Sequence, residues 1–165
     1  MTDSKFYKSF KDNMDAMGLP APASLFGTFA VAISTTSAIA GAITKLGSSA
    51  TIAEVLLTIP AASGAAAFAA GVSEVCVAAG ALVASFYLGA CIGCLIAAAF
   101  DVYGASAYYK LKPWMAKMGK YLQMPAGDYM FLSIMRFPEL SPMRRFVDKA
   151  RLLDGGSRNT GARYA

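Results

Sequence analysis

Few side chains in this chain could carry out chemistry. Histidine is absent, which excludes a Ser-His or Cys-His catalytic relay and the commonest metal sites. Cys91 and Cys94 have metal-like or redox-like spacing, but they lie in an Ala-rich apolar run without two further zinc ligands. We interpret both as buried apolar filling, and the odd number of cysteines predicts no disulfide framework. No glycine-rich phosphate loop is present, so we expect no enzyme, cofactor or metal site.

Four ionisable residues lie within or beside a long apolar stretch: Lys45, Glu54, Glu74 and Asp101. A charge near membrane depth is costly, and it usually faces water or a protein interior. Repeated around an oligomer axis, Glu54 or Glu74 would form a carboxylate ring that attracts and selects cations. Both glutamates also lie where helices are expected to begin, so helix capping and the helix dipole offer a second, compatible explanation.

These charges interrupt an apolar stretch that dominates the chain. Residues 16–100 carry only three charges, and the 165-residue chain is 15% charged, whereas soluble domains are about 25% charged. The charge-free runs, residues 16–44, 55–73 and 75–100, are 29, 19 and 26 residues long. Because about 20 apolar residues cross a bilayer as a helix, we expect a membrane-inserting protein. The alternative is a soluble core built around apolar central helices.

We predict an all-α fold, in which Ala/Gly-rich apolar helices form a helical hairpin or a three-helix bundle and amphipathic basic helices follow. The first apolar helix is expected over residues 24–46. Thr51-x-x-Glu54 has the capping-box pattern and opens a second helix, about residues 52–71. Pro60 lies inside this second helix and should kink or break it.

A third helix is expected to open at Ser73 and Glu74 and to continue through Phe100, or as far as Leu111, before Pro113 stops it. At about 1.5 Å per residue it would exceed the ~30 Å hydrocarbon core, so it should tilt or project. The predicted organisation is a polar N-terminal segment (1–22), apolar membrane-inserting helices (23–111), a basic amphipathic helical part (112–154) and a flexible tail (155–165).

Small residues recur at helical spacing along the apolar stretch. In lipid, backbones pack closely where no bulky side chain separates them, so such rows predict contacts between helices. The rows are Ser85/Gly89/Gly93/Ala97, Cys76/Gly80/Ala84 and Ser37/Gly41. The strict G-x-x-x-G formed by Gly89 and Gly93 fits close packing inside one monomer as well as an oligomer seam.

The residues after the apolar stretch are basic, with eleven Lys or Arg and five Asp or Glu from Asp101 onward. Trp114 and Tyr121 interleave with Lys117 and Lys120, as in a helix at a membrane surface. A similar basic helix is expected over residues 141–153, with Ser141 as its cap and Pro142 at its first position. Both segments fit ordinary surface helices equally well. We expect no nucleic-acid partner, because no binding motif accompanies these charges and anionic lipid headgroups explain them.

A secretory signal is not expected either. Ala38-Ile-Ala40 mimics a signal-peptidase site, but the N-terminal region balances Lys with Asp and two prolines follow. A small chain with an Ala/Gly-rich apolar middle and the Gly89-x-x-x-Gly93 spacing resembles the pore-forming antibacterial effectors of the bacterial type VI secretion system. Within that family it is similar to the small glycine-zipper toxins carried inside the tube of Hcp rings. The resemblance covers residues 24–100 and no motif of the basic C-terminal part.

The resemblance implies a protein that is cytoplasmic in the producer and is secreted into the periplasm of a rival cell. There it would insert into the inner membrane as a homo-oligomer, conduct cations and dissipate the membrane potential. It also implies the Hcp ring as carrier and a cognate membrane immunity protein as partner.

Two further hypotheses stay open. A phage holin also combines apolar helices with a basic tail, but it makes large unselective holes from the cytoplasmic side. A non-toxic structural or accessory membrane protein is the other. For a toxin exported through water we predict two states: a soluble one, in which helices within residues 111–153 cover the apolar helices, and an inserted one, in which lipid replaces that cover.

Overall fold

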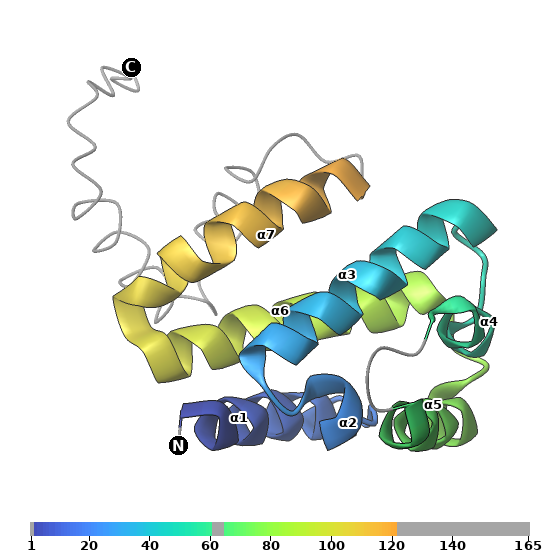
Figure 1. Ribbon diagram of the computed structural model, residues 1–165, viewed down its shortest axis with the longest axis horizontal. Coiled ribbons are helices and arrows are strands. Elements are labelled where there is room, and N and C mark those ends of the chain that lie inside the picture. Colours follow the sequence, from blue (N-terminus) through green and yellow to red (C-terminus); the bar gives the residue numbers. More distant parts are fainter. Residues whose placement is uncertain (1, 61–64, 122–165) are drawn as a thin grey trace.

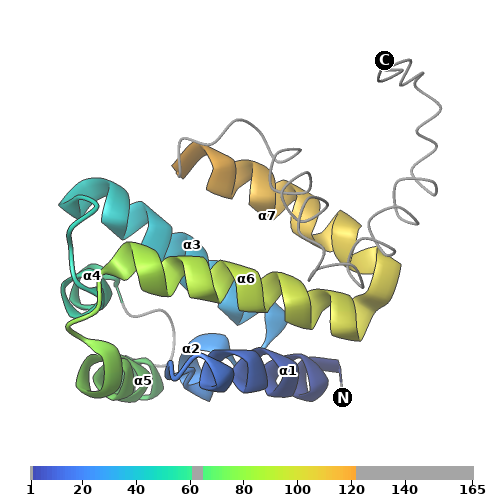
Figure 2. The same cartoon turned by 180° about the vertical axis from the view of Figure 1, so that it is seen from behind.

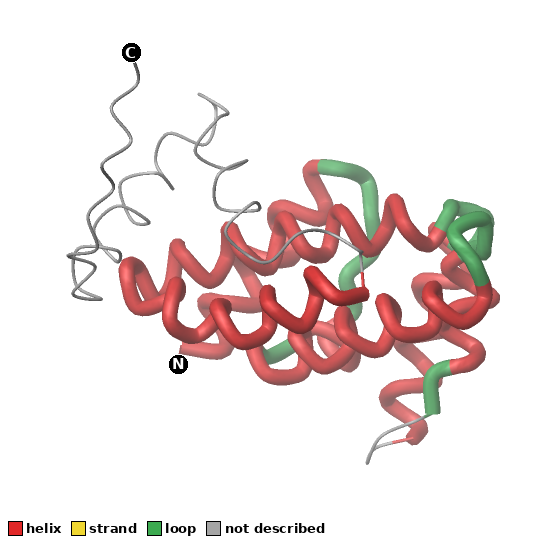
Figure 3. The backbone as a smooth tube through the Cα atoms, turned by 90° about the horizontal axis from the view of Figure 1, so that it is seen from above, coloured by secondary structure: helices red, strands yellow, loops and turns green. Residues whose placement is uncertain are grey.

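The computed structural model describes residues 2–60 and 65–121, and within these ranges the fold is all-α, as predicted, with no strand (Figure 1). Short loops join the helices (Figure 3). The elements are α1 (Thr2–Ala16), α2 (Ala23–Phe26), α3 (Phe29–Leu46), α4 (Ile52–Thr58), α5 (Ala65–Ala79), α6 (Ala84–Tyr103), the 3-10 turn η1 (Gly104–Ser106) and α7 (Ala107–Tyr121).

Helix α6 is the centre of the bundle. Eleven of its 20 residues are buried, among them Cys91 and Cys94. Helices α1, α3, α4 and α7 all pack against it. Helix α3 lies beside α6 and runs in the opposite direction, so the two form a helical hairpin in space although other elements separate them in sequence (Figures 1 and 2).

The N-terminal segment, expected only to be polar, forms a helix that belongs to the core. Phe6, Phe10 and Met14 recur at every fourth position of α1 and are fully buried, and α1 packs against α6. Phe6 meets Phe29 edge to face with ring centroids 5.4 Å apart, and Phe10 stacks on Phe26 at 5.0 Å. The four-residue spacing of these apolar side chains is the sequence signal for this amphipathic helix.

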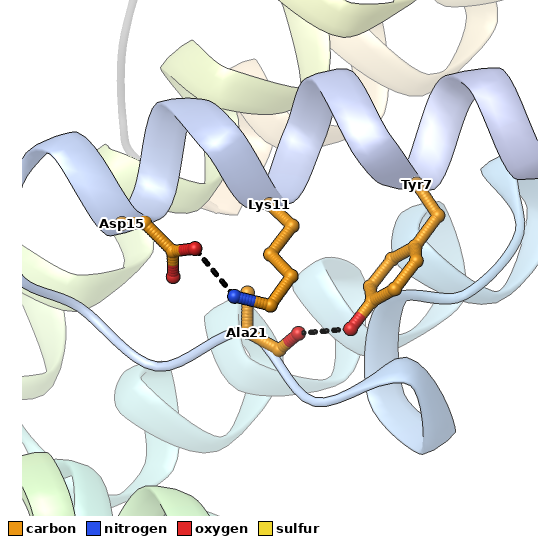
Figure 4. A network of polar contacts seen from close by, with 4 residues as sticks. All are labelled: Tyr7, Lys11, Asp15 and Ala21. Carbon is orange, nitrogen blue, oxygen red and sulfur yellow. Dashed lines mark hydrogen bonds and ion pairs between the residues drawn. The ribbon is translucent and has the colours of Figure 1, made fainter.

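Two tyrosines fasten the loop after α1. The Tyr7 hydroxyl donates to the Ala21 carbonyl oxygen at 2.9 Å (Figure 4), and the Tyr87 hydroxyl of α6 donates to the Pro20 carbonyl oxygen at 2.7 Å. Burial raises the pKa of the Tyr7 hydroxyl above its ordinary value of 10.0. The ion pair between Lys11 and Asp15, further along α1, is solvent-exposed (Figure 4). The loop is thus held by α1 and α6 together.

The first apolar helix starts later than predicted. The chain turns at Gly27, where a Cβ would lie 2.4 Å from the Ala23 carbonyl oxygen. Helix α3 then begins at Phe29, with Thr28 as its N-cap, because the Thr28 hydroxyl oxygen accepts from the Val31 amide at 3.2 Å. Its end at residue 46 is the predicted one.

Pro60 separates two helices and does not kink a continuous one. Helix α4 ends at Thr58, and Ile59 is extended, as the residue before a proline prefers. Helix α5 begins at Ala65. The prediction of a single helix over residues 52–71 is therefore wrong. Of the two effects expected from Pro60, a kink or a break, the break is observed.

The third helix, predicted to open at Ser73 and Glu74, is also two helices: α5 ends at Ala79, and α6 begins at Ala84 after a turn. Glu74 lies inside α5 and opens neither helix. The Ile52 amide donates to the Leu82 carbonyl oxygen at 2.8 Å, and the Ala84 amide donates to the Ala50 carbonyl oxygen at 2.8 Å. These bonds join the α5–α6 turn to the α3–α4 turn. Pairing between distant segments thus interrupts a stretch whose composition favours a continuous helix.

Pro113 was expected to stop the third helix, but it lies inside helix α7. The chain reverses at η1, where Gly104 has a positive φ of 56°, and α7 runs back along the bundle (Figure 1). Pro113 lies in the second turn of α7, which continues to Tyr121 despite the loss of one backbone hydrogen bond. Packing of the buried residues Leu111, Trp114, Met115 and Met118 stabilises it. The helix expected at 141–153 and the tail expected at 155–165 lie outside the described residues.

The capping box predicted at the start of α4 is confirmed. The Thr51 hydroxyl oxygen accepts from the Glu54 amide at 3.3 Å. The Glu54 carboxylate accepts from the Thr51 amide at 2.8 Å and from the Thr51 hydroxyl at 2.9 Å. The hydrogen bonds from Thr51 lower the pKa of the Glu54 carboxyl.

We expect the stability that this box contributes to depend on pH. A carboxyl whose pKa is lowered by folding stabilises the fold above its ordinary pKa of 4.5, and the contribution is lost as the pH falls through the lowered pKa. Glu54→Gln should therefore lower the thermal unfolding midpoint at neutral pH, and its effect should shrink as the pH falls below 4.5 and through the lowered pKa. Thermal melts followed by circular dichroism across this pH range measure the unfolding midpoint. Glu74→Gln is the matched control, since it also removes an exposed carboxylate. A Glu54→Gln effect that is constant with pH would contradict it.

Candidate functional site

Two segments of the described structure are long and apolar enough to cross a membrane, judged by length and composition: Phe29–Leu46 and Ala84–Tyr121. The first is α3. The second includes α6, η1 and α7, and because the chain reverses at η1, α6 is its straight apolar helix (Figure 2). At about 1.5 Å per residue, its 20 residues extend about 30 Å, the thickness of a hydrocarbon core. Central helices of soluble cores pass the same test.

The row of small residues predicted on α6 lies on the face that the bundle leaves open. Ser85, Gly89 and Gly93 are exposed and Ala97 is partly exposed, whereas most other positions of α6 are buried. A Cβ at Gly89 or Gly93 would meet no described atom within 4 Å. Packing inside one monomer therefore does not use this row in the described part of the chain. Its role as an oligomer seam stays a prediction.

The row of Ser37 and Gly41 on α3 faces α7 instead. The Trp114 indole N–H donates to the Ser37 hydroxyl oxygen at 3.1 Å. A Cβ at Gly41 would lie 3.8 Å from the Tyr121 ring, an ordinary contact distance. This small-residue row thus contacts Trp114 and Tyr121, the two aromatic side chains of α7 that were predicted to lie at a membrane interface.

Gly80, expected on a helix face with Cys76 and Ala84, lies in the turn between α5 and α6. A Cβ at Gly80 would approach the Cys76 carbonyl oxygen to 2.3 Å, so a larger residue would force the turn to move. The Gly80 carbonyl oxygen also accepts from the Ala53 amide at 3.2 Å. The residue shapes this end of the bundle, and the expected helix face does not form.

The four residues expected at a membrane interface divide into two pairs. Trp114 is only 5% exposed and Tyr121 is partly buried, since both pack towards α3. Lys117 and Lys120 are exposed on α7. Contact of all four with a membrane requires α7 to leave α3, and this interfacial role stays a prediction.

The ionisable residues of the apolar stretch do not converge on one site. Glu54 and Glu74 are exposed on the neighbouring helices α4 and α5, and Lys45 is exposed in the last turn of α3. The Asp101 carboxylate accepts from the Ser9 hydroxyl at 2.6 Å, which joins α6 to α1. Within the described residues, no group of three or more His, Cys, Asp or Glu could hold a metal ion. A selectivity ring formed by Glu54 or Glu74 would require several copies of the chain.

A groove of about 940 Å³ lies between α3 and α7, and the end of α4 closes one side of it. Its lining includes Lys45 from α3, Pro60 beyond α4, and Trp114, Lys117 and Tyr121 from α7. The groove was not predicted from the sequence, because it forms only when α7 folds back over α3. The interleaving of aromatic and basic residues along α7 was its one sequence signal.

Exposed apolar side chains gather at the end of the bundle where α3 ends and α6 begins. They come from α4, from the ends of α3 and α5, from the α5–α6 turn and from the start of α6, and they are Leu46, Leu57, Val77, Leu82, Val83 and Phe86. Val77 is 87% exposed, Leu57 75% and Phe86 61%. We call these six residues the apolar end. Apolar side chains that form a large contiguous surface patch commonly mark an interaction site.

Three surfaces thus stand out in the described structure: the open small-residue face of α6, the groove between α3 and α7, and the apolar end. All three belong to the two helices that could cross a membrane or to the elements joined to them. No protein-family model, curated protein or solved structure matches this chain.

Proposed function

We propose that this chain is a pore-forming toxin that is stored as a helical bundle and inserts its α3–α6 hairpin into a bilayer. The main support is the open face of Ser85, Gly89 and Gly93 on α6, a helix otherwise mostly buried. In lipid, such a face allows the backbones of two helices to approach closely. Several copies of α6 would then pack around a common axis as a homo-oligomer.

Exchange of protein cover for lipid cover makes insertion energetically feasible. In the bundle, α1 and α7 shield the hairpin from water through buried side chains such as Phe10 and Trp114. Each large apolar side chain removed from water contributes about 1.5–3 kcal/mol of stabilisation. Lipid tails would remove the apolar side chains of the hairpin from water in the same way as α1 and α7 do. Insertion therefore replaces one apolar environment of α3 and α6 by another. The apolar end is the surface from which this exchange would start.

The exposed carboxylates would supply cation selectivity. Glu54 lies beside the α3–α4 turn, at the end of the bundle where α3 ends and α6 begins, and Glu74 lies on the adjoining α5. In an oligomer of hairpins, these side chains would recur around the axis. Rings of carboxylates attract cations and exclude anions.

The resemblance to type VI secretion effectors gives the proposal its biological setting. The chain would travel inside the Hcp tube as a folded bundle, reach the periplasm of a rival cell and enter its inner membrane. There it would dissipate the membrane potential, and a membrane immunity protein would protect the producer.

Current across a planar bilayer under a salt gradient tests the proposal. We expect discrete conductance steps with a cation-selective reversal potential. Glu54→Gln combined with Glu74→Gln should move the reversal potential towards zero, because the fixed negative charge is lost. Large unselective jumps would instead favour a holin. A silent bilayer, with the protein remaining in solution, would mean that α3 and α6 belong to a soluble core and that the proposal is wrong.

A further inference from the structure

The groove between α3 and α7 has a volume in the range of small-molecule sites, about 940 Å³. One wall is a face of α3 that includes Ile33, Ala38 and Ala42. Only 33% of the residues of α3 are buried in the bundle. The groove is thus a stretch of apolar helix that α7 covers incompletely, and it suits an elongated apolar group.

The charges in the groove are all positive. Lys45 and Lys117 line it, and no Asp or Glu does. Among the described residues, neither lysine has an ion-pair partner. Helix α7 adds Lys120 near the same end and carries no acidic residue. A ligand that complements this groove therefore combines an apolar chain with an anionic group.

The neutral donors of the groove are largely occupied. The hydroxyls of Ser37, Thr44 and Thr58 already donate to backbone carbonyl oxygens of their own helices, at 2.7 to 2.9 Å. The Trp114 indole N–H donates to the Ser37 hydroxyl oxygen. Among the described lining residues, Lys45 and Lys117 carry the only charged donors, and ammonium groups bind phosphate as point charges.

We propose that this groove binds one anionic phospholipid, with its phosphate held by Lys45 and Lys117 and one acyl chain lying along α3. The lipid would occupy the wall against which Trp114 and Tyr121 hold α7. Binding therefore competes with the contact between α7 and α3, and it loosens the cover of a candidate membrane helix. This inference rests on the proposed membrane function for its biological meaning. It adds the class of lipid that would trigger the release of α7 from α3.

The chain contains its own reporter for this site. Trp114 is the single tryptophan of the sequence, and it lines the groove. The experiment titrates the full chain with short-chain phosphatidylglycerol carrying brominated acyl chains, below its micelle concentration, and follows quenching of tryptophan fluorescence. Phosphatidylcholine with the same brominated chains is the comparison. We expect saturable quenching by phosphatidylglycerol and about tenfold weaker binding of phosphatidylcholine, because its choline group opposes the two lysines.

Charge variants locate the binding. K45E/K117E should weaken phosphatidylglycerol binding about tenfold or more, and the milder K45Q/K117Q should weaken it in the same direction. K5E/K8E changes the net charge equally on exposed positions of α1 and should leave the affinity unchanged. Circular dichroism verifies that each variant keeps its helices.

Several outcomes would overturn the proposal: absent quenching, equal quenching by the two lipids, or equal loss in K5E/K8E. Inorganic phosphate that displaces the lipid at the lipid's own concentrations would also overturn it, since the site would then recognise the anion alone. No bilayer is present in this titration. If the chain binds the lipid but gives no current in a planar bilayer, the pore proposal is wrong and the lipid site stands. If it gives current but does not bind the lipid, the lipid site is wrong and the pore proposal stands.

Discussion

Replacing Phe10 with alanine is expected to destabilise the bundle by about 3–5 kcal/mol, the usual cost of truncating a fully buried phenylalanine. Phe10 is 0% exposed, and its ring stacks on those of Phe6 and Phe26 at centroid distances of 6.0 and 5.0 Å. The change removes the centre of the contact between α1 and the rest of the core. Urea unfolding followed by circular dichroism measures the loss.

Lys8→Ala is the matched control, since Lys8 is exposed on the same helix and its truncation should change the stability by no more than about 0.5 kcal/mol. A loss below about 1 kcal/mol for Phe10→Ala would mean that α1 is not part of the core. If α1 shields the hairpin as proposed, Phe10→Ala should also bind vesicles faster than the wild type, because the shielded state has become less stable.

The second large effect is expected from Gly89→Ile combined with Gly93→Ile, which should abolish conductance and leave the soluble fold intact. Neither new side chain would meet a described atom at its Cβ, and both positions are exposed, so we expect the bundle to accommodate both. Isoleucine also has a better helix propensity than glycine, by about 0.5 kcal/mol per position. In a membrane, by contrast, the two branched side chains would hold neighbouring helices apart. Planar-bilayer current and thermal unfolding of the same preparation measure both halves of the prediction.

The control for this variant is Ala69→Ile combined with Ser73→Ile, which adds similar bulk four residues apart on the exposed side of α5. It should conduct like the wild type. Full conductance in the glycine variant would remove the face of α6 from the mechanism. Equal loss in the α5 control would mean that added bulk blocks insertion regardless of where it lies.

Features set by neighbouring residues were predictable from the sequence. The capping box of Thr51 and Glu54 needs only a hydroxyl and a carboxylate three positions apart at a helix start. The stop at Gly47, where φ is 101°, needs only a residue without a Cβ. The all-α class followed from long apolar runs rich in alanine. In each case the determining contacts lie within one turn of helix.

Features set by contacts between distant segments were not predictable in this way. The break between α5 and α6 depends on hydrogen bonds from Ile52 and to Ala50, about 30 residues away in sequence. Pro113 remains inside α7 because its neighbours Trp114 and Met115 are buried against other helices. The core role of α1 was readable from the spacing of Phe6 and Phe10, but the polar composition around them concealed it.

In the candidate site, too, features set by neighbouring residues were predictable and features set by distant contacts were not. Spacing alone identified the row of Gly89 and Gly93, but only the packed structure distinguishes this open face from the row of Ser37 and Gly41, which α7 covers. The groove depends on the reversal of the chain at Gly104, and the interleaved aromatic and basic residues of α7 indicate only one of its walls. Residue spacing defines which side chains share a face, and tertiary packing decides what that face meets.

The pairing of the two turns also defines a boundary within the chain. Because the Ala84 amide bonds to the Ala50 carbonyl oxygen at 2.8 Å, the chain leaves the hairpin and returns to it at nearly the same point. Residues 51–83, including α4 and α5, are in topological terms an excursion from a two-helix module made of α3 and α6. The excursion still belongs to the core, because Ile52, Val55 and Val75 are fully buried. The paired turns thus fix where the excursion begins and ends, and its buried side chains fix how it packs on the module.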